Sequence, residues 1–136
     1  MDLITCFAAF NFLAGSVDAY STNLYVDAEF EYNPLARRAM LWLGKIPTLC
    51  VFTCLLAAYC WATTLLPPGL WQYLFIGCHA LEGTLHLVAA HVNRYKRPPV
   101  GFGWAVSLML RMFHMVAPRA QRRLYERVVR RARFGR

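Results

Sequence analysis

Six polar side chains that could do chemistry lie inside the apolar stretches of this 136-residue chain. They are Asp18, Thr22, Lys45, His79, Glu82 and His86. An ionised group in the hydrocarbon of a membrane costs about 3 kcal/mol or more unless it meets a partner or water. Carboxylate, imidazole and ammonium groups can form buried ion pairs, bind a metal or pass protons. We treat these six residues as one predicted intramembrane polar cluster.

Three kinds of chemistry fit the cluster. The first is a structural network in which Asp18 pairs with Lys45 and Glu82 pairs with His86, because unpaired buried charges are costly. The second is a metal or haem site of His79, Glu82 and His86, which share a helix face but lack the His-Glu-x-x-His signature of zinc enzymes. The third is a proton or ion relay, since ionisable groups within membrane spans often mark such paths. We favour the structural network, without a cofactor.

Three apolar runs must position these residues. They cover residues of about 3–26, 40–65 and 70–93. Each is long enough to cross a bilayer as a helix, which takes about 20 residues. In the first run, Asn11, Asp18 and Thr22 are spaced i, i+7, i+11, so they share a face that must point at protein or water. The predicted fold class is therefore all-α, a polytopic bundle with three transmembrane spans.

The connection between the first two runs carries a helix start signal. Glu31, Asn33 and Pro34 form a Glu-x-Asn-Pro turn, in which Asn can cap a helix and Pro suits its first position. We expect one helix over 35–65, interfacial in its first residues and kinked at Pro47.

Helical rise gives the depth of the cluster in this arrangement. Measured from the cytoplasmic ends of the spans, Asp18 lies roughly 12 Å deep and Lys45 about 7–8 Å deep. His86 lies about 10 Å deep and Glu82 about 16 Å deep. All four side chains can then meet in the cytoplasmic half of the bundle.

The charges of the chain are strongly segregated. Charged residues make up only 16% of the sequence, yet the net charge is +8, and more than half of the fifteen Lys and Arg follow residue 110. We therefore divide the chain into a transmembrane domain, 1–97, and a basic amphipathic membrane-surface region, 98–136. Within the second region, 100–116 is short for a span and has basic flanks, so an interfacial or re-entrant helix is preferred over a fourth transmembrane helix. The positive-inside rule places the C-terminus in the cytoplasm and the protein in the inner membrane.

The basic tail is the predicted site for lipid or a partner. Its candidate residues are Arg119, Arg122, Arg123, Arg127, Arg130 and Arg131. Each basic residue near an anionic membrane surface contributes about 1 kcal/mol. Because the tail directly follows membrane segments, lipid is preferred over nucleic acid as its partner.

These motifs together resemble a known family. The matching residues are Asn11, Asp18, Thr22, Glu31, Asn33, Pro34 and Lys45, with Asn93 at the end of the third helix. Over residues 7–93, their order is similar to that of the small prokaryotic membrane domain called DUF5658, whose function is unknown. The resemblance implies that Asp18, the Glu-x-Asn-Pro turn and Lys45 form one structural unit. The histidine-rich third helix and the basic extension depart from the family pattern.

Three functions are compatible with these sequence features. No nucleophile–base pair, phosphate loop or metalloprotease signature is present, so an enzyme is not expected. The preferred function is a non-enzymatic scaffold or accessory subunit that packs with partner proteins or anionic lipid. The alternatives are a holin-like pore former and an oligomeric ion or proton carrier that uses the polar cluster. Small residues such as Gly15, Gly77 and Gly83 could allow helices of separate chains to associate.

Overall fold

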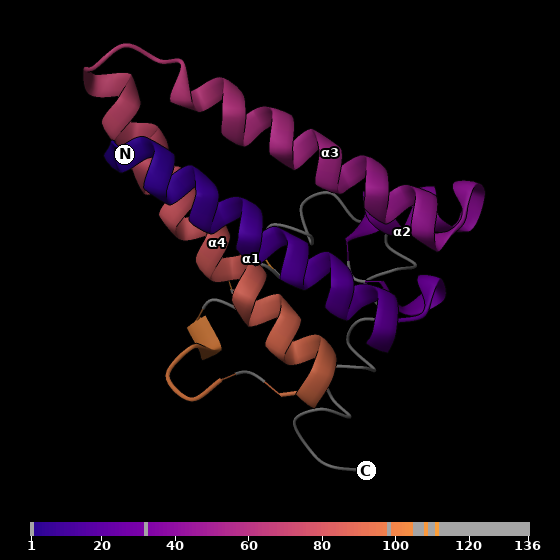
Figure 1. Cartoon of the computed structure of the whole chain (residues 1–136). Coiled ribbons are helices and arrows are strands. Elements are labelled where there is room, and N and C mark those ends of the chain that lie inside the picture. The colour runs from indigo at the N-terminus through magenta and orange to yellow at the C-terminus, as the bar shows by residue number, and fades with distance from the viewer. Residues whose placement is uncertain (1, 32, 98, 105–107, 109–110, 112–136) are drawn as a thin grey trace.

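The prediction of an all-α membrane fold is confirmed by the computed structural model, which describes residues 2–31, 33–97, 99–104, 108 and 111 (Figure 1). Its elements are α1 (Leu3–Tyr25), a 3-10 turn η1 (Ala28–Phe30), α2 (Pro34–Leu43), α3 (Lys45–Thr64) and α4 (Leu70–Tyr95). Among these residues, α1, α3 and α4 are long and apolar enough to cross a membrane.

Helix α1 is the centre of the bundle. It packs most extensively against α4 and next against α3 (Figure 1). Asn11 contacts His79 while Asp18 contacts His86, so α1 and α4 run parallel. This direction is the one that three successive membrane crossings would require of the first and third helices.

The start of α1 is fixed by Asp2. Its carboxylate accepts a hydrogen bond from the Thr5 backbone N–H at 3.0 Å. This bond satisfies one of the N–H groups that a helix start leaves without an internal partner. The Thr5 hydroxyl, and after it this backbone bond, hold the pKa of Asp2 below its usual value, because hydrogen bonds to the carboxylate favour its charged form.

The predicted turn before α2 is confirmed. Asn33 Oδ1 accepts from the backbone N–H of Leu35 at 3.0 Å and of Ala36 at 3.4 Å. Pro34 takes the first helical position, where its missing N–H costs nothing. Glu31 Oε1 in turn accepts from the Asn33 N–H at 2.9 Å. The three motif residues therefore form a single capping unit.

The predicted continuous helix over 35–65 is wrong, because the chain breaks at Gly44. Gly44 has a φ of 91°, which residues with a Cβ rarely adopt, and it separates α2 from α3. The second span therefore covers Lys45–Thr64 rather than 40–65. Pro47 lies in the first turn of α3, where no intrahelical hydrogen bond is lost, so it causes no kink.

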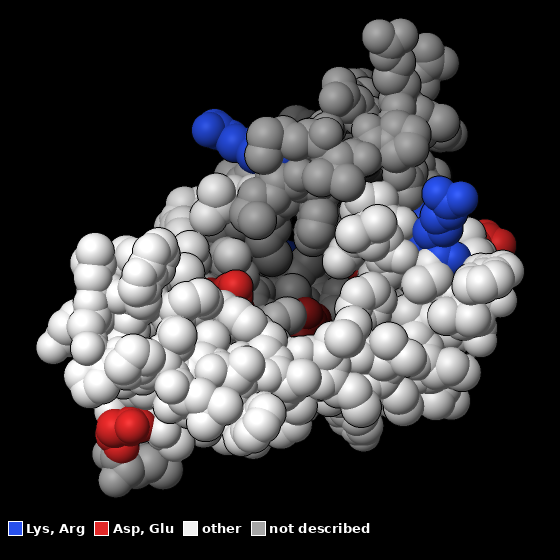
Figure 2. Space-filling model, turned by 90° about the horizontal axis from the view of Figure 1, so that it is seen from above, with Lys and Arg blue, Asp and Glu red and all other residues white. Residues whose placement is uncertain are grey.

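Helix α2 has a surface compatible with the membrane-surface position predicted for the first residues of this segment, which stays a prediction. It buries Ala36 and Met40 and leaves Trp42 84% exposed. Tryptophan favours the headgroup level of a bilayer. Figure 2 shows one face of the molecule, where the described surface is mostly uncharged and Lys and Arg lie near its margin.

The predicted membrane-surface region, 98–136, lies largely outside the described residues. The residues outside the description include most of the predicted interfacial helix at 100–116 and all six arginines of the predicted tail site. Both remain predictions from the sequence.

Candidate functional site

The polar residues of the spans meet between α1 and α4 in two separate groups. The first layer consists of Asn11, Thr63, His79 and Glu82. Asn11 Nδ2 donates to Glu82 Oε2 at 2.8 Å and lies 3.0 Å from His79 Nδ1. Asn11 and His79 are completely buried. This layer joins α1 to α4 and, through Thr63, to α3.

The contacts of His79 define its tautomer. Thr63 Oγ1 donates to the Cys60 carbonyl at 2.8 Å, so its hydroxyl accepts from His79 Nε2 at 2.7 Å. With the proton on Nε2, His79 Nδ1 accepts the second N–H of Asn11. A neutral imidazole therefore satisfies every one of these contacts. Asn11 Oδ1 remains buried without a partner in the described part of the chain.

The second layer consists of Asp18, Ser21, Thr22, His86 and Asn93. His86 Nδ1 donates to Asp18 Oδ2 at 2.9 Å. Asn93 Nδ2 donates to Asp18 Oδ1 at 3.3 Å, and to the hydroxyls of Ser21 and Thr22 at 3.0 Å each. Both oxygens of the Asp18 carboxylate are thus bonded from α4.

A seven-residue spacing places the two layers in register. His79, His86 and Asn93 follow one another at this interval in α4, as Asn11 and Asp18 do in α1. Two helices with a seven-residue repeat keep the same faces together when they wind around each other. Polar residues at such positions specify which partner face is used, because a shifted register would leave them unpaired.

The helices approach closely at Gly83. A Cβ at this position would stand 3.2 Å from Asn11 Cα and closer still to the Phe10 ring. A Cβ at Gly15 would meet a side chain of α3, whereas nothing lies within 4 Å of one at Gly77. Gly15 and Gly83 therefore pack against other helices of the same chain, and the association of separate chains through small residues stays a prediction.

Gly83→Ala is expected to lower the free energy of unfolding by about 1–3 kcal/mol, as overpacking does. The added carbon must displace the Phe10 ring and move the Asn11 backbone by a few tenths of an ångström, which strains the Asn11–Glu82 bond. SDS titration of the purified protein in mixed micelles, followed by circular dichroism, measures the change. Gly77→Ala is the matched control, and we expect it to be neutral or stabilising because Ala favours a helix by up to about 1 kcal/mol. Equal stability of the two variants would contradict the close approach.

The predicted ion pair between Asp18 and Lys45 is wrong. Because α3 begins at Lys45, this residue lies at the entrance of its span rather than 7–8 Å inside it. Lys45 Nζ instead donates to the Asn23 carbonyl at 2.6 Å, and Lys96 Nζ donates to the Tyr25 carbonyl at 3.0 Å. The last carbonyls of a helix lack internal partners and form the negative end of its dipole. Two lysines from other segments thus cap the end of α1.

Lys45→Met should destabilise the bundle by about 1–2 kcal/mol, since it removes a charge-assisted hydrogen bond and a favourable dipole contact. Thermal unfolding in a neutral detergent, followed by circular dichroism, tests this. Arg38→Met provides the comparison, because Arg38 is an exposed basic residue of α2. If Lys45→Met and Arg38→Met unfold at the same temperature, the contact of Lys45 with α1 does not contribute to the stability of the bundle.

The predicted pairing of Glu82 with His86 is also wrong. Glu82 bonds to Asn11, and His86 bonds to Asp18. His79 contacts Asn11 and Thr63, so His79 and Glu82 meet at Asn11 while His86 bonds elsewhere, and the three side chains do not converge on one point. Within the described ranges, no group of three or more His, Cys, Asp or Glu side chains is arranged to hold a metal. The alternative of a site formed by His79, Glu82 and His86 therefore finds no support.

Four residues belong to the layers although they lie outside the predicted cluster. They are Asn11, Ser21, Thr63 and Asn93. The seven-residue spacing of polar residues in the first and third runs was the signal that could have found two of them, Asn11 and Asn93. Ser21 and Thr63 gave no such signal, because helix hydroxyls commonly bond only to their own backbone, as both also do here.

No protein-family model, curated protein or solved structure is found to match this chain. The resemblance to DUF5658 therefore remains a prediction from the motifs. In the structure, the Glu-x-Asn-Pro turn caps α2, Lys45 caps α1 and Asp18 bonds to α4. The three parts of the motif thus act at three separate places: the start of α2, the end of α1 and the contact between α1 and α4.

Proposed function

We propose that this chain is a non-enzymatic subunit of a membrane assembly, a fixed three-helix anchor that presents a basic surface to anionic lipid or a partner protein. One observation carries the proposal. Asp18, His79, Glu82 and His86, the ionisable residues of the layers, bond to other residues of the same bundle. Side chains engaged in this way fix helix register and favour a single packing arrangement.

The same observation favours an anchor over the two alternatives. A holin-like pore needs helices that reassemble around water, which would break both layers and expose their charges to lipid. A carrier needs ionisable groups that change partners during transport. Asp18 has both carboxylate oxygens bonded from α4, so such a change would break several hydrogen bonds together.

Basic residues supply the binding surface of this anchor. Arg94, Lys96 and Arg97 are exposed at the end of α4, and the tail arginines follow them in the sequence. At an anionic membrane surface each basic residue contributes about 1 kcal/mol. The tail would lie on the cytoplasmic surface of the inner membrane, as the positive-inside rule predicts.

Reconstitution into liposomes separates the three functions. The full chain is inserted into vesicles that contain either a self-quenching dye or a pH-sensitive dye. We expect neither dye release nor proton entry above that of empty vesicles. Dye release would overturn the anchor in favour of a pore, and proton entry that is lost in Asp18→Asn would overturn it in favour of a carrier.

The tail is tested in the same vesicles with a fluorophore at the C-terminus. In vesicles with anionic lipid we expect the fluorophore to lie at the surface and to be released by salt, because screening weakens exposed charge contacts. Replacing the six predicted tail arginines with Gln should abolish surface binding. Equal behaviour in neutral and anionic vesicles would contradict the lipid role of the tail.

A further inference from the structure

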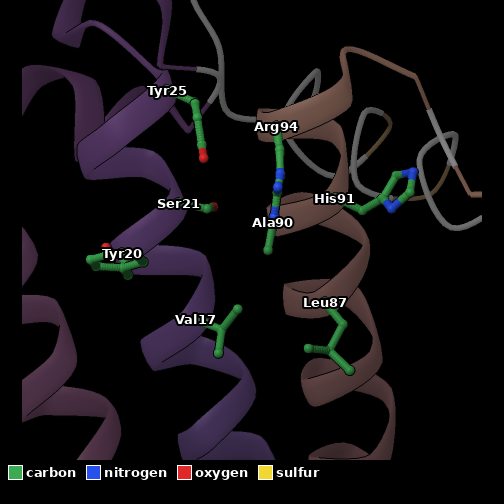
Figure 3. A pocket seen from close by; sticks show the side chains of 8 residues that line it. All are labelled: Val17, Tyr20, Ser21, Tyr25, Leu87, Ala90, His91 and Arg94. Carbon is green, nitrogen blue, oxygen red and sulfur yellow. The ribbon is translucent and has the colours of Figure 1, made fainter.

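A groove of about 280 Å³ runs between α1 and α4 near the ends where both helices finish (Figure 3). Its lining residues are Val17, Tyr20, Ser21 and Tyr25 of α1, and Leu87, Ala90, His91 and Arg94 of α4. Figure 3 shows Val17, Tyr25 and Arg94 in the gap between the helices, whereas His91 points away from α1. The groove lies beside the second layer, on the outer side of the bundle.

The groove changes from apolar to polar along its length. Val17 and Leu87 lie at one end, while Tyr25 and Arg94 lie at the other. From Leu87 to Arg94 the helix rises about 10 Å, which matches the depth from the headgroups into the upper acyl chains. Tyr and Arg near the ends of spans favour the headgroup level. The groove thus has an apolar floor within the membrane and a polar mouth at its surface.

Its volume suits part of a lipid rather than a whole soluble ligand. Pockets that enclose small molecules usually measure about 300–1,000 Å³. A groove of about 280 Å³ that opens sideways has room for the upper part of one acyl chain and leaves the remainder in the bilayer. The apolar lining and the position within a span both fit this occupant.

The charge at the mouth selects an anion. The Arg94 guanidinium lies 5.1 Å over the Tyr95 ring, and no carboxylate in the described part of the chain forms an ion pair with it. The C-terminal end of α4 carries a partial negative charge of about one half. Lys96 and Arg97 follow directly in the sequence and outweigh this effect. Arginine presents paired N–H donors that match phosphate oxygens.

We propose that this groove binds one anionic phospholipid, with an acyl chain along Val17 and Leu87 and the phosphate held by Arg94. The Tyr25 hydroxyl reaches toward the same mouth and offers a second donor. A zwitterionic lipid would bind more weakly, because its own cation competes with Arg94 for the phosphate. The proposal deepens the proposed function, because Arg94 belongs to the basic surface of the anchor, but it does not involve the tail arginines. A lost lipid preference in Arg94→Gln tests the groove alone, whereas dye release or proton entry tests the anchor.

Native mass spectrometry of the full chain tests the site, with phosphatidylglycerol and phosphatidylcholine added separately in neutral detergent. We expect a 1:1 complex with phosphatidylglycerol at least about fivefold tighter than that with phosphatidylcholine, which corresponds to about 1 kcal/mol. Arg94→Gln should remove this preference. Arg38→Gln is the matched control and should keep it, since Arg38 is an exposed basic residue of α2 that does not line the groove.

A second variant tests the apolar part. Val17 is 50% exposed, so Val17→Trp fills the groove without entering the core. It should reduce the 1:1 complex with phosphatidylglycerol at least about fivefold while circular dichroism shows unchanged helix content. The proposal is overturned if both lipids bind equally to the wild type, if Arg38→Gln has the same effect as Arg94→Gln, or if Val17→Trp binds like the wild type.

Discussion

His86→Leu is expected to lower the free energy of unfolding by about 2–4 kcal/mol, the largest effect of any single substitution in the bundle. The variant removes the donor that lies 2.9 Å from Asp18 Oδ2 and leaves this carboxylate only the shared amide of Asn93. Breaking a buried pair in a soluble protein costs about 3–5 kcal/mol. We expect a smaller loss here for two reasons. The Asp18 side chain is 20% exposed, so water can partly solvate its charge. In the unfolded state within a membrane, its polar groups also find other hydrogen-bond partners. SDS titration in mixed micelles with a helicity readout gives the value.

Two further variants make this result specific. His91→Leu removes a histidine of the same helix that belongs to neither layer, so it should change stability by less than about 1 kcal/mol. Asp18→Leu combined with His86→Leu should recover most of the loss, because an apolar pair often replaces a buried ion pair without penalty. Strictly additive single effects would show that the two side chains do not interact in the membrane-embedded protein.

The sequence was sufficient to predict three long apolar helices and the face that α1 uses, although not the break between α2 and α3. Run length alone distinguishes a membrane span from a soluble helix, since a bilayer requires about 20 apolar residues. The spacing of Asn11, Asp18 and Thr22 placed them together, and all three contact α4. Asn33 and Pro34 predicted a helix start because their preferences arise from local backbone geometry.

The errors concern relations between helices. Gly44 is compatible with a continuous apolar helix, so local preference did not reveal its positive φ. That one break moved Lys45 to the start of α3, where it meets the carbonyl of Asn23 instead of Asp18. Spacing within α4 defines a face but not the register against α1, so Glu82 could not be assigned to Asn11 in advance. The seven-residue repeats of polar residues in α1 and α4 indicate which residues of the two helices lie side by side. They can be used in this way only once the two helices are known to be parallel.

Asn11→Leu is expected to lower the free energy of unfolding by about 2–3 kcal/mol, the second large effect. Asn11 is completely buried, and its amide serves both Glu82 and His79. Leucine has a similar size, so the loss arises from a carboxylate and an imidazole nitrogen that are left without a donor. The substitution also removes Asn11 Oδ1, which is buried without a partner in the described part of the chain and therefore destabilises the wild type. This gain offsets part of the cost, so the expected loss of stability is smaller than for His86→Leu. Asn23→Leu is the control, because that side chain belongs to neither layer.

Replacing Glu82 with an apolar residue distinguishes two possible causes of the lost stability in Asn11→Leu, an unpaired carboxylate and poorer packing. If an unpaired carboxylate causes the loss in Asn11→Leu, then adding Glu82→Leu should restore at least about 1 kcal/mol, since replacing both partners by apolar groups is often nearly neutral. If the loss instead reflects poorer packing beside Gly83, the second substitution should destabilise further. A double variant less stable than Asn11→Leu alone would therefore refute the hydrogen-bonded first layer and assign its role to the close contact of the two helices.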